Sequence, residues 1–127
     1  MRIEDQVVLM GNTDCPQKVL AHSSIFAFPS SFEGWGLALT EAMSVGLPCI
    51  GLKKTAAVNE LIIHGFNGVL AKDEKDFVVL LKHLMDNPEE RNRMGSNGRA
   101  FVEQFSPQIV WDKWEDLIRE TIQEYWE

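Results

Sequence analysis

Short apolar runs alternate with longer segments of helical composition along this chain. The apolar runs lie at residues 7–11, 25–29, 48–52 and 69–71, and each is too short for a helix, which favours buried β-strands. Strands that alternate with helices imply a parallel sheet with helices on its faces. The pattern therefore predicts an α/β domain.

The longer segments have the composition or the apolar spacing of helices. Phe77, Leu80, Leu81, Leu84 and Met85 recur at three- and four-residue steps, which is typical of a helix with one buried face. Further helices are predicted at residues 14–23, 37–45, 56–63, 88–94, 97–105 and 107–127. Gly46 suits the end of the second of these, and Gly95 suggests an interruption between the fourth and the fifth. Ser106 and Pro107 suit the cap and the first turn of the last helix.

Composition and charge narrow the class of protein. The chain has 127 residues, of which 45% are hydrophobic and 24% charged, as expected of one globular domain or a large part of one. Four short strands are few for such a sheet, which favours a part of a larger domain. The formal net charge of -7 argues against nonspecific binding of nucleic acid or anionic lipid. With no signal-like start and no long apolar run, a cytoplasmic location is expected.

The two cysteines are far apart and predict neither a disulfide framework nor a zinc site. Cys49 lies within the apolar run at 48–52 and is expected to be a small buried hydrophobic residue. Cys15 precedes Pro16 at a predicted helix start. The candidate chemistry therefore has to be sought elsewhere.

The stretch at residues 30–48, SSFEGWGLALTEAMSVGLP, holds a glycine turn between a predicted strand and a predicted helix. Gly34 and Gly36 have no side chains to keep a ligand from the backbone. The amides of Leu37 and Ala38 would be unpaired at the helix start, where they could receive a phosphate. In open parallel sheets, ligands gather at such strand-to-helix turns.

Two carboxylates flank this turn. Glu33 in the loop and Glu41 in the second helical turn could both reach a ligand that lies over the helix start. Carboxylates accept hydrogen bonds from paired hydroxyls, which suits ribose and sugar rings. The spacing of these residues alone leaves two interpretations of the stretch equally open. It is either a glycine turn with a glutamate at the helix start or a nucleotide-sugar site.

The same stretch resembles the donor-binding signature of glycosyltransferases with the GT-B fold, particularly the retaining enzymes of family 4. The family pattern is a proline and serine followed by E-G-[aromatic]-G-L-x-x-x-E-A-M-[small]-x-G-x-P. The matching positions here are Pro29, Ser30, Glu33, Gly34, Trp35, Gly36, Leu37, Glu41, Ala42, Met43, Ser44, Gly46 and Pro48. The likeness continues through NELIIHGFNGVLA and the closing helices, so it covers nearly the whole chain. It implies a Rossmann-like parallel sheet flanked by helices, as part of the C-terminal domain of a GT-B fold.

The resemblance also implies roles for individual residues. Glu41 would bind the ribose hydroxyls, and Glu33 would lie near the donor sugar as the candidate catalytic residue. The other donor-binding residues would be Gly34, Trp35, Gly36, Leu37 and Ala38, with the amides around Gly36 to Ala38 meeting the diphosphate. No metal or cofactor is implied, and the favoured mechanism is a front-face substitution assisted by the leaving phosphate.

Two departures from the family pattern affect what the chain is expected to do. The N-terminal domain, which holds the acceptor, is absent from these residues, as are an arginine and a lysine that neutralise the diphosphate in the family. Lys53 and Lys54 do not match that pattern and are interpreted as solvated loop lysines. Thr55, Ala56 and Ala57 replace a glycine pair, which implies either a stiffer loop or a different donor sugar.

We therefore expect residues 1–127 to be a partial C-terminal nucleotide-sugar-binding domain of a retaining glycosyltransferase. The whole protein would transfer a hexose from a UDP- or GDP-sugar to a glycan or lipid-linked acceptor, in the cytoplasm or peripherally at the inner face of the membrane. The chain alone is expected to be inactive, because the acceptor-holding domain is missing. The alternative is a non-catalytic nucleotide-sugar-binding or interaction module of the same fold.

The last helix, at residues 107–127, is expected to cross toward the missing N-terminal domain, as it does in the family. Trp111, Trp114 and Trp126 lie on it. These rings could cover a surface that the missing domain would bury, or they could pack on the present domain. Packing on the present domain is expected for Trp114, and both alternatives stay open for Trp126.

Overall fold

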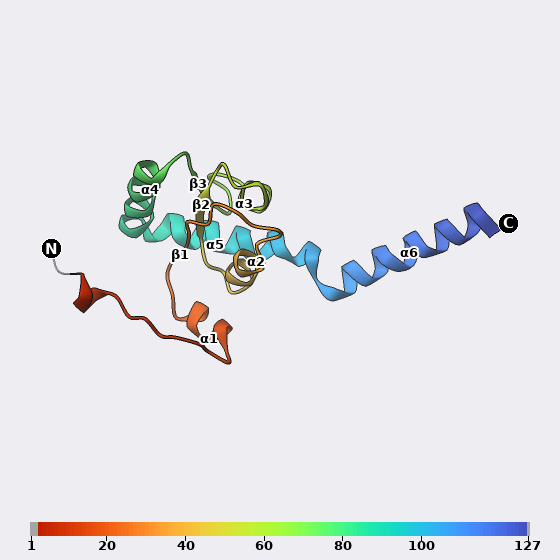
Figure 1. Ribbon diagram of the computed structural model, residues 1–127, viewed down its shortest axis with the longest axis horizontal. Coiled ribbons are helices and arrows are strands. Elements are labelled where there is room, and N and C mark those ends of the chain that lie inside the picture. The colour runs from red at the N-terminus through yellow and green to blue at the C-terminus, as the bar shows by residue number, and fades with distance from the viewer. Residues whose placement is uncertain (1–2, 127) are drawn as a thin grey trace.

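A computed structural model describes residues 3–126 of the chain as three parallel strands flanked by helices (Figure 1). The elements run in the order η1 (Glu4–Gln6), α1 (Pro16–Ala21), β1 (Phe26–Phe28), α2 (Leu37–Ser44), β2 (Cys49–Leu52), α3 (Ala56–Leu61), β3 (Gly68–Ala71), α4 (Glu74–Asp86), α5 (Pro88–Val102), η2 (Glu103–Phe105) and α6 (Pro107–Trp126). The predicted α/β class is confirmed, as are the three strand predictions that begin at residues 25, 48 and 69.

The strands lie in the order β1-β2-β3, with every neighbouring pair parallel. Cys49 of β2 is level with Phe26 of β1 and with Gly68 of β3, so the three strands end at one edge of the sheet. All four residues of β2 are buried, because this strand has a neighbour on either side and helices on both faces. The carboxyl edge of the sheet is where the loops to α2, α3 and α4 begin.

Alternate residues of β2 face two separate apolar clusters. Cys49 belongs to the cluster built with α2 and α3, whereas Ile50 belongs to the cluster built with β3, α4 and α5. Burial raises the pKa of the Cys49 thiol to about 12, because the thiolate would lose its hydration in this apolar cluster. The prediction that Cys49 is a small buried hydrophobic residue is confirmed.

A left-handed glycine ends α2 as the sequence predicts. Gly46 has φ 84°, its amide donates to the carbonyl of Met43, and the next amide, that of Leu47, donates to Ala42. This pair of bonds satisfies carbonyls at the helix end that would otherwise lack partners. The chain then turns directly into β2.

The helix α5 is continuous from Pro88 to Val102, so the predicted interruption near Gly95 is wrong. A Cβ atom on Gly95 would lie 2.0 Å from the carbonyl oxygen of Gly46. The glycine is therefore needed for a close approach between the backbones of α5 and α2, and it does not break the helix.

The predicted strand at residues 7–11 is also wrong. The structure has no strand there, and Val8 and Leu9 are 81% and 93% exposed. The segment runs apart from β1, the outer strand of the sheet on that side (Figure 1). An apolar run becomes a strand only where a neighbour completes its hydrogen bonds, and within residues 3–126 this run has none.

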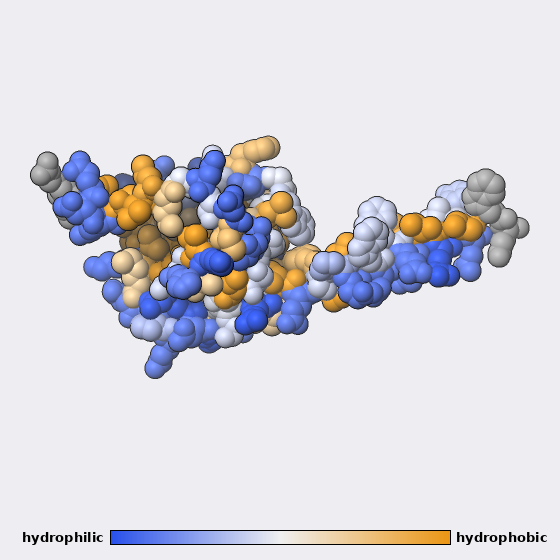
Figure 2. Space-filling model, turned by 90° about the horizontal axis from the view of Figure 1, so that it is seen from below, coloured by the Kyte–Doolittle hydropathy of each residue, from blue (hydrophilic) through white to orange (hydrophobic). Residues whose placement is uncertain are grey.

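The last helix, α6, leaves the rest of the molecule and extends into solvent (Figure 1). Trp114 is 55% exposed, so the expectation that it packs on this domain is wrong; the side chain of Trp126 lies outside the described part. One side of α6 carries an apolar stripe and the other is mainly hydrophilic (Figure 2). The stripe consists of Val110, Trp111, Trp114, Leu117, Ile118, Ile122 and Tyr125. Among residues 3–126, no helix has the length and apolar content needed to cross a membrane.

Replacing Gly95 with alanine tests the close approach of α2 and α5. Helix propensity alone would make Gly95→Ala stabilising by about 1 kcal/mol. The clash with the Gly46 carbonyl reverses the sign, and we expect the free energy of unfolding to fall by about 2–3 kcal/mol in urea titrations. Ser96→Ala, at the neighbouring exposed position, is the control and should change it by less than about 0.5 kcal/mol. A more stable Gly95→Ala variant would contradict the packing described here.

Candidate functional site

The glycine loop at residues 29–36 follows β1 at the carboxyl edge of the sheet and leads into α2. Its start is tied down by two hydroxyl groups. The Thr55 Oγ1 hydroxyl donates to the carbonyl of Ser30 over 2.8 Å, and the Ser30 hydroxyl donates to the carbonyl of Phe32 over 2.9 Å. Thr55 is 2% exposed, so the loop after β1 is joined to the turn after β2 by a buried side chain.

Gly36 shapes the end of this loop, and only glycine fits its backbone comfortably. It is the N-cap residue of α2, with φ 82° in the left-handed region. A Cβ atom there would also lie 3.3 Å from side-chain atoms of both Leu39 and Leu61, which belong to the core. The Gly36 carbonyl accepts the amides of Leu39 and Thr40 and so begins the helix.

Two amides remain available at the start of α2. The amides of Leu37 and Ala38 have no acceptor within residues 3–126, because they belong to the first helical turn. The Leu37 side chain is 69% exposed, so solvent reaches this end of the helix. Free amides and the positive end of a helix dipole together attract an anion such as a phosphate.

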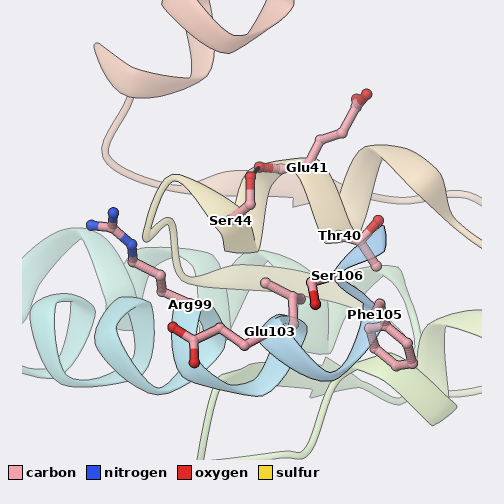
Figure 3. Close-up of a pocket in the computed structure, with 8 residues that line it drawn as sticks. Thr40, Glu41, Ser44, Arg99, Glu103, Phe105 and Ser106 are labelled. Atoms are coloured by element: carbon pink, nitrogen blue, oxygen red, sulfur yellow. Dashed lines mark hydrogen bonds between the residues drawn. The ribbon is translucent and has the colours of Figure 1, made fainter. Parts of the chain in front are cut away.

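The two glutamates occupy the positions that the spacing predicts. Glu33 lies half-buried in the loop, and Glu41 lies exposed in the second turn of α2. The Glu41 side chain points away from Arg99 and Glu103 of the neighbouring helical segment (Figure 3). Within the described residues, neither carboxylate forms a hydrogen bond or an ion pair, so both can accept hydrogen bonds from a ligand.

A small apolar cavity lies beside Glu41, between α1 and α2. Its volume is about 180 Å³, and its lining residues are Thr13, Pro16, Val19, Leu20, Phe26, Ala38 and Glu41. Ala38 and Glu41 were predicted as site residues, whereas the contributions of the other five were missed. No local motif marks these five, because they reach the cavity only through the packing of α1 and β1 beside α2.

A second cavity, of about 380 Å³, lies on the other side of Glu41, between α2 and the junction of α5, η2 and α6 (Figure 3). Its lining residues are Thr40, Glu41, Ser44, Arg99, Val102, Glu103, Phe105 and Ser106. The hydroxyls of Thr40 and Ser44 already donate to carbonyls within α2. The residues from α5 onward were missed in the sequence, because nearly 60 residues separate them from α2 along the chain.

Trp35 packs outward from the glycine loop onto this same junction. Its ring meets that of Phe105 edge to face, with the ring centres 5.2 Å apart and the planes at 89°. Phe105 in turn meets Phe101 of α5 edge to face at 5.9 Å. Trp35, one of the predicted donor-binding residues, is thus in ring contact with the segment between α5 and α6.

The two lysines after β2 line neither of the cavities that adjoin Glu41. Lys53 and Lys54 are exposed after β2, in agreement with their interpretation as loop lysines. Lys54 lines a separate cavity of about 390 Å³ with Asp73, Glu74 and Lys75. In the described part of the chain, no group of three or more His, Cys, Asp or Glu side chains is arranged to hold a metal ion.

Comparisons with known proteins identify the family of this chain. The family model described as "Glycosyl transferases group 1" matches residues 1–101. The N-acetyl-alpha-D-glucosaminyl L-malate synthase of Bacillus anthracis is 31% identical over 127 residues, which cover 98% of this chain and 33% of that protein. The chain thus spans about a third of the length of this curated relative.

Solved structures show the same fold. A sucrose-phosphate synthase from Thermosynechococcus elongatus superimposes with a TM-score of 0.83 at 22% identity, over 94% of this chain and 31% of that one. A variant of TarM from S. aureus, in complex with fondaparinux, alpha-GlcNAc-glycerol and UDP, superimposes with a TM-score of 0.77 at 28% identity. That match covers 91% of this chain and 25% of the other. The fold matches part of that of GT-B glycosyltransferases, and the chain belongs to the glycosyl transferases group 1 family.

Proposed function

We propose that this chain is the nucleotide-sugar-binding part of a retaining glycosyltransferase. The whole protein would transfer a hexose from a UDP- or GDP-sugar to a glycan or lipid-linked acceptor. One observation carries the proposal: the unpaired amides of Leu37 and Ala38 lie one helical turn from Glu41, whose carboxylate has no partner in the described part of the chain. Amides that can donate hydrogen bonds to an anion lie beside a carboxylate that can accept them from hydroxyls. This arrangement suits a phosphate attached to ribose.

The proposed donor is held through its successive groups. The diphosphate lies on the amides of Leu37 and Ala38, and Glu41 accepts hydrogen bonds from the ribose hydroxyls. The base enters the apolar cavity between α1 and α2, because this cavity adjoins Glu41 and offers a flat base mainly apolar contacts. A uridine nucleotide is supported by the TarM structure, a 28% identical neighbour whose complex includes UDP.

In the proposed reaction, the leaving phosphate of the donor, and not a side chain of this chain, receives the proton of the acceptor hydroxyl. The acceptor hydroxyl attacks the anomeric carbon on the face from which the phosphate leaves. The bond between the anomeric carbon and the phosphate oxygen breaks, and the hydroxyl proton passes to that oxygen. Because the new bond forms on the face that the phosphate leaves, the anomeric configuration is retained. Glu33 lies beside the sugar in this proposal and orients it. Glu33 is therefore the proposed catalytic residue of this loop: it contacts the donor sugar but forms no covalent intermediate with it.

The rest of the proposed protein supplies the acceptor site and cations for the diphosphate. This chain carries a net charge of -7 and two free carboxylates at the proposed site, so a diphosphate would be repelled without added positive charge. We propose that α6 crosses to the domain that holds the acceptor, with its apolar stripe buried there. The chain alone therefore binds donor weakly and transfers no sugar.

Removing the charge of Glu41 tests the proposed ribose contact. Glu41→Gln keeps the size of the side chain but weakens its hydrogen bonds to two hydroxyls, so we expect the affinity for UDP or GDP to fall about tenfold. Isothermal titration calorimetry of both nucleotides against both proteins measures the change. Glu89→Gln, at an exposed position in the first turn of α5, carries the same charge change and should leave affinity unaltered. Equal affinities of Glu41→Gln and the unchanged chain would remove Glu41 from the site.

Thr55 offers a test of loop stiffness, since it stands where the family has glycine. Thr55→Val keeps the shape of the side chain but leaves the Ser30 carbonyl without its donor, so the free energy of unfolding should fall by about 1–2 kcal/mol. Thr55→Ser retains the hydroxyl and should lose less than half as much. Urea unfolding followed by circular dichroism compares the two. If the valine variant were as stable as the serine variant, the hydrogen bond would not hold the loop.

A further inference from the structure

The middle of the glycine loop has few contacts of its own. Its start is held by Thr55 and its end by the first turn of α2. Between them, the Glu33 carboxylate has no hydrogen bond or ion pair with the described residues, and a Cβ atom on Gly34 would meet nothing within 4 Å. Trp35, by contrast, has a partner, because its ring meets that of Phe105 edge to face.

Phe105 lies at the point where the chain changes direction between α5 and α6. It is the last residue of η2, and the next residue, Ser106, has φ -60° and ψ 147°, which is extended backbone between two helical segments. The angles of Ser106 thus set the direction of α6 relative to α5. Phe105 directly precedes this residue, so its ring packs beside the junction of η2 and α6.

A cavity lies beside the ring of Phe105. Phe105 and Ser106 both line the 380 Å³ cavity that also borders Thr40 and Glu41 of α2 (Figure 3). A residue packed on all sides could not shift without displacing its neighbours, whereas one that borders a cavity can. On its other side, Phe105 meets Phe101 of α5, which gives the ring a fixed neighbour in the body of the domain.

We propose that Phe105 is a positioning residue for the donor site: its edge-to-face contact with Trp35 holds Glu33 and Gly34 in the donor-binding arrangement. The inference rests on the proposed function, because it assumes that the loop binds a nucleotide sugar.

The test replaces the ring while keeping apolar volume. Phe105→Leu keeps an apolar side chain at this position but removes the edge-to-face pair. The energy of such a pair corresponds to a change of about three- to tenfold in the ratio of ordered to disordered loop. Phe77→Leu is the matched control, because Phe77 is another partly buried phenylalanine and packs on the Ile50 cluster of the other face. Phe105→Tyr keeps the ring and should behave as the unchanged chain.

Two measurements are made on each variant: backbone ¹⁵N relaxation of Gly34 and Trp35 without ligand, and UDP and GDP affinity by calorimetry. We expect lower order parameters at Gly34 and Trp35 and a three- to tenfold weaker nucleotide affinity in Phe105→Leu only. If Phe105→Leu does not fold, Trp35→Leu removes the same contact from the exposed side and should lower the order at Gly34 equally.

Three results would overturn the inference, and they are distinguishable. Unchanged order at Gly34 and Trp35 in a folded Phe105→Leu variant would show that the rings do not hold the loop. Lower order with unchanged affinity would show that the ring contact does not serve donor binding, while the proposed function stood. An unchanged chain that binds neither UDP nor GDP would overturn the proposed function itself, and the inference with it.

Discussion

The backbones of α2 and α5 approach so closely that the carbonyl of Gly46 occupies the space that a side chain on Gly95 would need. This constraint sets where α2 lies relative to the last helices, and the candidate site depends on α2 throughout. The free amides at its start, Glu41 in its second turn and the cavities on either side of Glu41 all follow from its position. A shift of α2 would also separate Trp35 from Phe105.

Much of the fold could be predicted because its signals are local. The strands near residues 25, 48 and 69 are short apolar runs, and the end of α2 at Gly46 needs only a left-handed glycine. The errors concern residues whose state depends on distant neighbours. Residues 7–11 have the composition of a strand but no neighbour to pair with among residues 3–126. Gly95 suggests a helix break from its sequence, although it serves a close contact with the end of α2. Trp114, which is exposed, was mispredicted for the same reason, because a sequence does not reveal which surface the apolar side of an amphipathic helix packs on.

The candidate site divides in the same way. Glu33, Gly36 and Glu41 lie within one motif, so their spacing and family resemblance indicate them directly. Phe105 and Thr55 come from other segments and reach the loop only through the packing of α5, η2 and the turn after β2. The position where the family has glycine thus holds a buried threonine that ties two loops together, which favours the stiffer of the two loop alternatives.

We propose that the loop and the first turns of α2 bind the nucleotide part of a sugar donor. Titration of the ¹⁵N-labelled chain with UDP and, separately, with GDP can locate the binding site, because each backbone amide reports its own surroundings. We expect the amide signals from Gly34 to Glu41 to shift first and furthest, while those of α4 stay in place. Shifts confined to α4, or to the cavity near Lys54, would rule this site out.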